Sequence, residues 1–152
     1  MPFPFSFHVR HPVASRRDLT PSQILQPLVA GLRVAGAYTV ELDGSRVRFR
    51  VDLYSQMLDT SAGPLTGISS GTLHLQESAT GQRELVGTVR TSHLPAGLMV
   101  LGGAAVALGT DVIRTGSLFL LGASGVYYLR TVSRFGAWLD EVFGPARLAG
   151  AA

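Results

Sequence analysis

The chain of 152 residues contains no cysteine, no lysine and no asparagine. Without cysteine, a disulfide framework, a zinc–thiolate site and a cysteine nucleophile are all excluded. Because lysine is absent, all 13 basic residues are arginine, and they are dispersed along the chain instead of forming one block. The net charge is only +3, and dispersed charges usually form a solvated surface. We therefore expect no nucleic-acid partner.

Charged residues are also scarce, at 15% of the chain, whereas a typical soluble domain has about a quarter. This shortage is local. Residues 10–90 contain nine arginines and seven acidic residues, whereas residues 94–129 contain only Asp111 and Arg114. The apolar excess therefore belongs to one segment in the second half of the chain.

A strand and a helix are predicted at the start of the chain. Apolar and other residues alternate over residues 3–9, which is typical of a strand with one buried face. Thr20 can then cap a helix, Pro21 suits its first position, and Gln23 can complete a capping box. Apolar residues follow at helical spacing: Ile24, Leu25, Leu28 and Leu32. Pro27 is expected to kink or shorten this helix.

Two β-hairpins follow in the sequence. The pair Asp43-Gly44 lies between the alternating segments 38–42 and 47–54, and this is a strong hairpin signal. A second hairpin is predicted to join residues 71–76 to residues 84–91. We therefore expect an α+β domain over residues 1–92, in which one helix packs on a small antiparallel β-meander of about four strands.

The apolar segment predicts a helical hairpin in a membrane. Residues 94–109 carry no charge, and a second apolar run, 116–129, follows a polar link. With their flanks these runs reach about 17 to 19 residues, which is enough to cross a hydrocarbon core of roughly 30 Å. We expect transmembrane helices within residues 93–130. Small residues would allow these helices to pack closely: Gly102, Gly103, Ala107, Gly122 and Gly125.

The alternative is a buried helical pair, since apolar runs of about ten to fourteen residues often have that role. We prefer the bilayer because a small meander cannot cover two helices that are apolar on every side. Tyr127, Tyr128 and Trp138 would then lie at the membrane interface. Arginines flank the outer ends of both runs, which predicts that both termini lie in the cytoplasm.

Residues 131–152 are predicted to form a short amphipathic helix and a tail. Apolar residues follow one stripe of this helix, namely Phe135, Trp138, Leu139, Val142 and Phe143. Such a stripe can rest in the headgroup layer or dock on the β domain, and the sequence leaves both alternatives open.

No catalytic, metal or cofactor site is predicted. Gly67-Ile68-Ser69-Ser70-Gly71 matches the nucleophile-elbow pattern, but that motif requires a strand–turn–helix in a parallel sheet. Here it lies between β segments, and we interpret it as a loop. The histidines lack a neighbouring carboxylate cluster of the kind that binds metal: His8, His11, His74 and His93. We therefore expect no enzymatic activity and no cofactor.

Arg46, Arg48 and Arg50 form a basic row, because side chains alternate along a strand and these three share one face. Two interpretations remain open. The row is either a solvated surface or a contact site for anionic headgroups or an acidic partner.

In layout the chain resembles small uncharacterised bacterial membrane proteins that have an N-terminal α+β domain and two closing spans. This resemblance implies a membrane anchor and transfers no active residue. We expect a non-enzymatic accessory or scaffold subunit of a bacterial inner-membrane complex, whose partners are the lipid bilayer and other membrane subunits or further copies of itself. The alternative is a membrane-anchored ligand-binding sensor or effector that oligomerises in the membrane.

Overall fold

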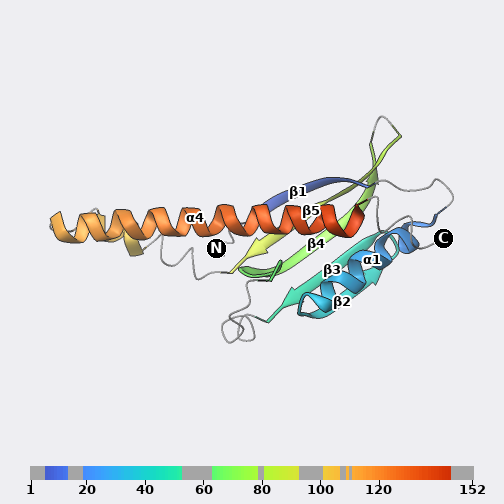
Figure 1. Ribbon diagram of the computed structural model, residues 1–152, viewed down its shortest axis with the longest axis horizontal. Coiled ribbons are helices and arrows are strands. Elements are labelled where there is room, and N and C mark those ends of the chain that lie inside the picture. Colours follow the sequence, from blue (N-terminus) through green and yellow to red (C-terminus); the bar gives the residue numbers. More distant parts are fainter. Residues whose placement is uncertain are drawn as a thin grey trace.

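The computed structural model describes residues 6–13, 19–52, 63–78, 81–92, 101–106, 109 and 111–144. The strands are β1 (Ser6–Val13), β2 (Ala37–Asp43), β3 (Arg46–Val51), β4 (Ile68–Glu77) and β5 (Arg83–Thr91), and the long helices are α1 (Pro21–Val34) and α4 (Asp111–Phe143). All five strands form one antiparallel sheet in the order β1-β5-β4-β3-β2. Both helices lie on one face of this sheet (Figure 1).

Helix α1 begins at the predicted capping box. The Thr20 hydroxyl accepts a hydrogen bond from the Gln23 backbone N–H at 3.4 Å, and Gln23 Oε1 accepts one from the Thr20 N–H at 2.9 Å. Pro27 lies within the helix, which nevertheless continues to Val34. The predicted apolar stripe of this helix is buried. Helix α1 thus connects β1, at one edge of the sheet, with β2 at the other.

Both predicted hairpins are confirmed. Strands β2 and β3 pair from Asp43–Arg46 outward, and Gly44 at the turn has a φ of 57°, a left-handed conformation that glycine adopts without strain. Strand β4 pairs with β5 along its length but starts earlier than predicted, at Ile68. Burial alternates along β3, where Val47, Phe49 and Val51 are buried and the arginines between them are exposed.

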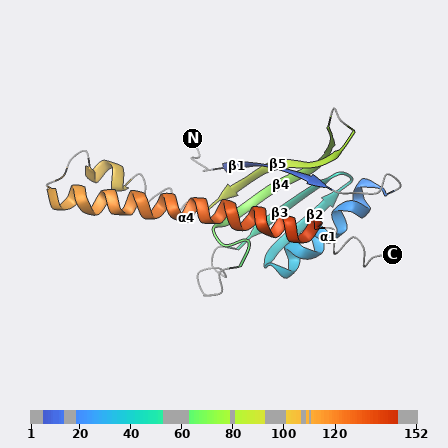
Figure 2. The same ribbon diagram turned by 45° about the horizontal axis from the view of Figure 1, so that its top comes forward.

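The C-terminal half of α4 packs on the sheet. Phe135 is fully buried, with its ring centroid 6.3 Å from that of Phe49 and 6.1 Å from that of Phe7. Trp138 reaches α1, where a Cβ atom added to Gly31 would lie only 2.9 Å from its ring. The remaining buried residues of this half are Leu139, Val142 and Phe143. The N-terminal half of α4 projects beyond the sheet (Figure 2).

The predicted transmembrane hairpin is wrong. In the described part of the chain, no helix has both the length and the apolar character needed to cross a membrane. Helix α4 instead runs without a break through residue 130. Arg130 and Arg134 interrupt its apolar surface, and the apolar stripe that follows Arg130 belongs to the core. The fold is therefore α+β with five strands. The expected bacterial inner-membrane location, with both termini in the cytoplasm, depended on the transmembrane hairpin and is contradicted with it.

The predicted C-terminal amphipathic helix is not a separate element, because it continues α4. Of the two alternatives for its apolar stripe, the structure selects docking on the sheet. The sheet offers this helix an apolar face built from alternate residues of its strands, including Phe7, Val9, Val47 and Phe49. The first apolar run is helical over residues 101–106 in the described part.

Candidate functional site

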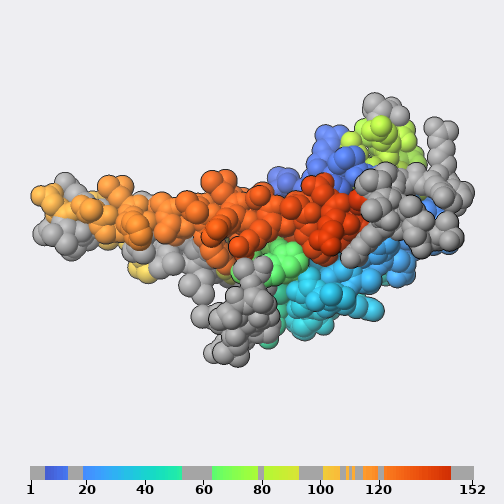
Figure 3. Space-filling model, in the orientation of Figure 1, coloured from blue at the N-terminus to red at the C-terminus, as the bar shows by residue number. Residues whose placement is uncertain are grey.

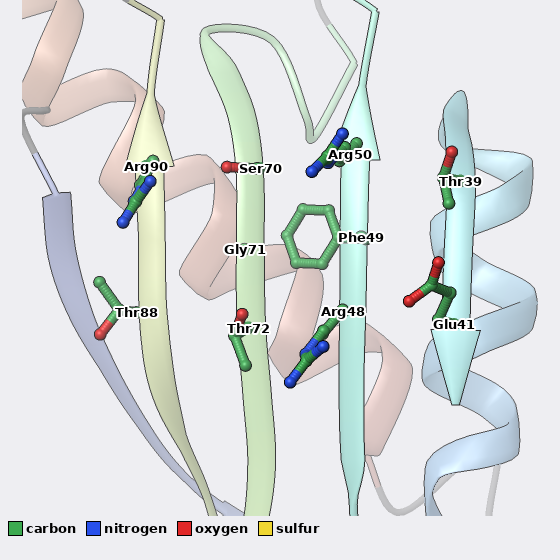
Figure 4. Close-up of a pocket in the computed structure, with 10 residues that line it drawn as sticks. All are labelled: Thr39, Glu41, Arg48, Phe49, Arg50, Ser70, Gly71, Thr72, Thr88 and Arg90. Carbon is green, nitrogen blue, oxygen red and sulfur yellow. The ribbon is translucent and has the colours of Figure 1, made fainter. Parts of the chain in front are cut away.

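The sheet face opposite the helices is polar and open. We call it the polar face. The side chains at its centre project away from α1 and α4 (Figure 4) and border a hollow of about 710 Å³. They come from four neighbouring strands, β2 to β5. Its polar lining residues are Thr39, Glu41, Arg48, Arg50, Ser70, Thr72, Thr88 and Arg90.

Strand register arranges these residues in rows across the sheet, because directly paired residues share a face. One row contains Asp43, Arg46 and His74, and the next contains Glu41, Arg48 and Thr72. Each of these two rows therefore places a carboxylate beside an arginine. Paired like this, opposite charges largely offset each other's field even without a close ion pair.

The third row differs in its charge. It contains Thr39, Arg50, Ser70 and Arg90 in that order. Ser6 of the edge strand β1 follows Arg90. In the described strands no acidic side chain occupies this row, so its two arginines flank Ser70 with no carboxylate directly opposite either of them. Both arginines are exposed.

A fifth arginine on the same face is neutralised by an ion pair. Arg10 Nε donates to Glu84 Oε2 at 2.7 Å. The hydrogen bond with Glu84, followed by the charge of the same carboxylate, raises the pKa of Arg10. Among the five arginines that the described strands place on the polar face, Arg50 and Arg90 are the two with no acidic residue in their own row or in an ion pair, although Asp52 follows Arg50 by two residues along the chain.

Arg50 and Arg90 are suited to bind one anionic group together. Neighbouring strands lie about 4.8 Å apart, so two residues on alternate strands are about 10 Å apart at their Cα atoms. Guanidinium groups extend from long side chains and bind carboxylates or phosphates in a bidentate manner. The hydroxyl of Ser70, between the two arginines, can donate a third hydrogen bond. Ser70 is half-buried and lies between the two arginines on β4.

The structure places Arg46, Arg48 and Arg50 on one face, as the alternation predicts, but their charges are not equivalent. Arg90 was not among the predicted site residues; it lies forty residues away from Arg50 in the chain and joins it through β4. The alternation of β5 was visible in the sequence. The predicted second hairpin already sets β5 beside β4, but the register of β4 against β3, which brings Arg50 opposite Ser70, could not be read from the alternation.

The residues of the nucleophile-elbow pattern lie in a turn and in strand β4. The Ser69 hydroxyl donates to the backbone oxygens of Arg90 and Thr91, at 3.1 and 3.3 Å. These hydrogen bonds lie where the pairing of β4 with β5 is irregular, between Ile68 and Ser70. Ser69 is therefore not exposed on a strand–helix turn, as a nucleophile elbow requires.

The histidines are dispersed. His8 lies on the polar face beside Thr88, whereas His11 faces α4, with Nδ1 3.6 Å from Asp140 Oδ1 and its ring 5.9 Å from that of Phe143. His93 lies outside the described residues. In the part of the chain that the structure describes, no three histidine or acidic side chains are grouped as a metal site would require.

The small residues proposed for helix packing lie in several environments. Gly102 is buried, whereas Gly103 and Gly122 are exposed. A Cβ atom added to Gly103, Gly122 or Gly125 would meet nothing within 4 Å. Ala107 lies outside the described residues. Their packing role stays a prediction.

The three aromatic residues expected at a membrane interface all lie on α4. Trp138 and Tyr128 pack against the hydrophobic core. The Tyr127 hydroxyl lies over the turn at Gly67, at 2.6 Å from where a glycine Cβ would stand. Burial raises the pKa of Tyr127, and the charge of Arg134 partly opposes this shift.

No family model, curated protein or solved structure matches this chain. The assignment of a function therefore depends on the geometry and the charge of the polar face.

Proposed function

We propose that this protein is a non-enzymatic accessory or scaffold subunit whose polar face docks on an acidic segment of another protein. The observation that carries the proposal is the row formed by Arg50, Ser70 and Arg90, which has two arginines and no acidic residue. A glutamate or aspartate of the partner would accept hydrogen bonds from both guanidinium groups. The carboxylates of Glu41 and Asp43 would repel further acidic side chains, which fixes the position of the segment.

The dimensions and chemistry of the polar face favour a protein segment over other anions. A hollow of about 710 Å³ that spans four strands is much larger than one phosphate group. Proteins that bind single-stranded nucleic acid stack its bases on aromatic side chains. The lining of this hollow contains one aromatic residue, Phe49, and its ring is buried toward the helices. Serine, threonine and arginine side chains can instead bind carboxylates and the backbone of a peptide.

The test measures binding of a fluorescein-labelled decapeptide of serine and alanine with two adjacent glutamates at its centre to the full chain by fluorescence anisotropy. We expect binding at about 50 mM salt that weakens strongly at about 300 mM, since exposed charges are screened. Arg50→Gln and Arg90→Gln should each weaken binding by about tenfold, because each removes one charge-assisted hydrogen-bonding partner. Arg33→Gln is the matched control. It makes the same charge change on α1, on the other side of the sheet, and should change binding less than twofold.

Arg48→Gln separates this geometry from a general effect of charge. Arg48 is paired with Glu41 in the register, so its loss should weaken binding less than the loss of Arg50 does. Equal losses for all four variants would show nonspecific attraction and reject the proposal. Displacement of the peptide by inorganic phosphate at low millimolar concentration would instead indicate a receptor for small anions.

A further inference from the structure

A second surface lies on the outward side of α4 and is independent of the polar face. Along this side, Phe119 is 77% exposed, Val126 59% and Leu129 67%. With Gly122, these residues have the spacing three, four, three, which places them along one seam of a helix. The neighbouring Leu118 is 61% exposed. A contiguous exposed apolar surface of this kind typically marks an interface.

The opposite side of the same helix is already occupied. Ser117, Ser124 and Thr131 are buried at intervals of seven residues, and Phe135 continues that side into the core. The outward seam lies about half a turn away from it. In the space-filling view, the N-terminal half of α4 forms an arm that extends away from the sheet (Figure 3). The seam therefore faces away from the protein's own core.

The seam contains a projection and a hollow three residues apart. Phe119 projects, whereas Gly122 lacks a side chain and a Cβ atom added there would meet nothing within 4 Å. A hollow of about 660 Å³ lies along this part of the helix, lined by Phe119, Gly122, Val126 and Arg130 among others. A large side chain that inserts into a gap on a facing helix is the knobs-into-holes packing of paired helices.

We propose that the outward seam binds the same seam of a second copy of this chain, with the two α4 helices antiparallel. A two-fold axis that crosses the helix pair between residues 120 and 121 sets Phe119 opposite the partner's Gly122. Because such an interface is isologous, each contact occurs twice. The same axis sets Val126 opposite the partner's Thr115. Each phenylalanine thus fills the hollow of the other copy.

The charges at the ends of the seam match this arrangement. The same axis sets Asp111 level with the partner's Arg130, and both residues are exposed. Neither has an ion pair within the described residues. A parallel pair would instead set Phe119 against Phe119 and Arg130 against Arg130, which opposes two projections and two like charges. Charge complementarity therefore selects the antiparallel pair.

The fold leaves room for this dimer. The paired segment, residues 111–130, is largely the part of α4 that projects beyond the sheet (Figure 2). In an antiparallel pair the two sheets lie at opposite ends. The polar face is on the other side of each sheet from α4 (Figure 4), so dimerisation leaves both polar faces open.

The first experiment measures the mass of the full chain by analytical ultracentrifugation between about 1 and 200 µM. A concentration-dependent dimer is expected. Gly122→Leu should abolish it, because the leucine fills the hollow that receives the partner's Phe119. Nonspecific hydrophobic association would be strengthened by the same change. Phe119→Gln removes the projecting side chain, which is 77% exposed, and should also abolish the dimer. Val34→Gln is its matched control, since Val34 is 90% exposed on α1, and it should leave the dimer unchanged.

The charge pair is tested by reversal. Asp111→Arg should weaken the dimer at least tenfold, because it sets two arginines level with each other. Adding Arg130→Asp in the same chain should restore most of the affinity, since the pair is then reversed and not lost. Circular dichroism of each variant checks that the helix is intact.

Orientation is tested by cross-linking, for which the absence of cysteine gives a clean background. A mixture of the Thr115→Cys and Val126→Cys chains should form a disulfide-linked dimer faster than either chain alone. Three results would overturn the proposal. The first is a monomer at every concentration, whether or not detergent or lipid is bound. The second is a dimer that persists in the Gly122→Leu variant. The third is cross-linking of Val126→Cys to itself that is faster than its cross-linking to Thr115→Cys.

Discussion

Phe135 connects α4 to the sheet through two aromatic contacts. Its ring stacks on that of Phe49 and meets that of Phe7 edge to face. We expect Phe135→Ala to lower the free energy of unfolding by about 3 to 5 kcal/mol, since a fully buried ring leaves a cavity. Phe119→Ala removes the same side chain at a position that is 77% exposed. In dilute solution it should change the free energy by no more than about 0.5 kcal/mol. Urea unfolding followed by circular dichroism measures both, and equal losses would contradict this packing.

Gly87 of β5 lies opposite Leu73 of β4. A Cβ atom added there would clash with the Thr72 carbonyl oxygen and would lie 2.8 Å from Leu73 Cα. Because both neighbours are backbone atoms, the strand cannot adjust cheaply. Gly87→Ala should therefore cost about 1 to 3 kcal/mol in thermal or urea unfolding.

Gly136 is the matched control for that substitution. It lies within α4, and an added Cβ atom would meet nothing within 4 Å. Gly136→Ala should stabilise the protein by about 0.5 to 1 kcal/mol, because glycine is unfavourable inside a helix. A Gly87→Ala variant as stable as Gly136→Ala would contradict the described strand spacing.

At the scale of the element, the start of α1 depends on a reciprocal pair of hydrogen bonds between Thr20 and Gln23. Thr20→Ala should cost about 1 kcal/mol, whereas Thr20→Ser should cost much less because serine caps equally well. Combining Thr20→Ala with Gln23→Ala should cost less than the sum of the two single changes, since the two residues share one motif. A strictly additive result in chemical unfolding would mean that the box does not stabilise the helix.

Helix α4 is one element with two environments. Its C-terminal half is amphipathic with respect to the sheet, and its N-terminal half has a buried side and an exposed apolar seam. The mean hydropathy of a segment does not distinguish these uses, because it ignores direction around the helix axis. For this reason hydropathy predicts a membrane span at residues 116–129, where the structure has part of α4 instead.

At the scale of the whole molecule, the sheet depends on α4 for its core. A chain that ends at residue 110 would leave Phe7, Phe49 and their neighbours without Phe135 and Leu139. We expect that shortened chain to lose cooperative urea unfolding and to bind a hydrophobic dye, because its apolar sheet face is open. A peptide of residues 111–143 added in trans should restore cooperativity. Cooperative unfolding of the shortened chain alone would show that the sheet and α1 suffice.

The sequence by itself determined the local elements of this protein. The capping box, the Asp43-Gly44 turn and the alternation along β3 each depend on residues that are close in the chain. Their signals are dihedral preferences and side-chain periodicities, which need no knowledge of the rest of the fold. For the same reason, the common face of Arg46, Arg48 and Arg50 could be predicted.

Only the tertiary structure decided what covers each apolar surface and which charges meet. An apolar helix lowers its free energy by leaving water whether a bilayer, a sheet or another helix covers it, so its composition does not identify the cover. Here the sheet covers the C-terminal half of α4. Likewise, Arg90 joins Arg50 because β4 pairs with both β3 and β5. The predicted meander gives the order of these strands, but the juxtaposition also depends on the register of β3 against β4, which no predicted hairpin turn fixes.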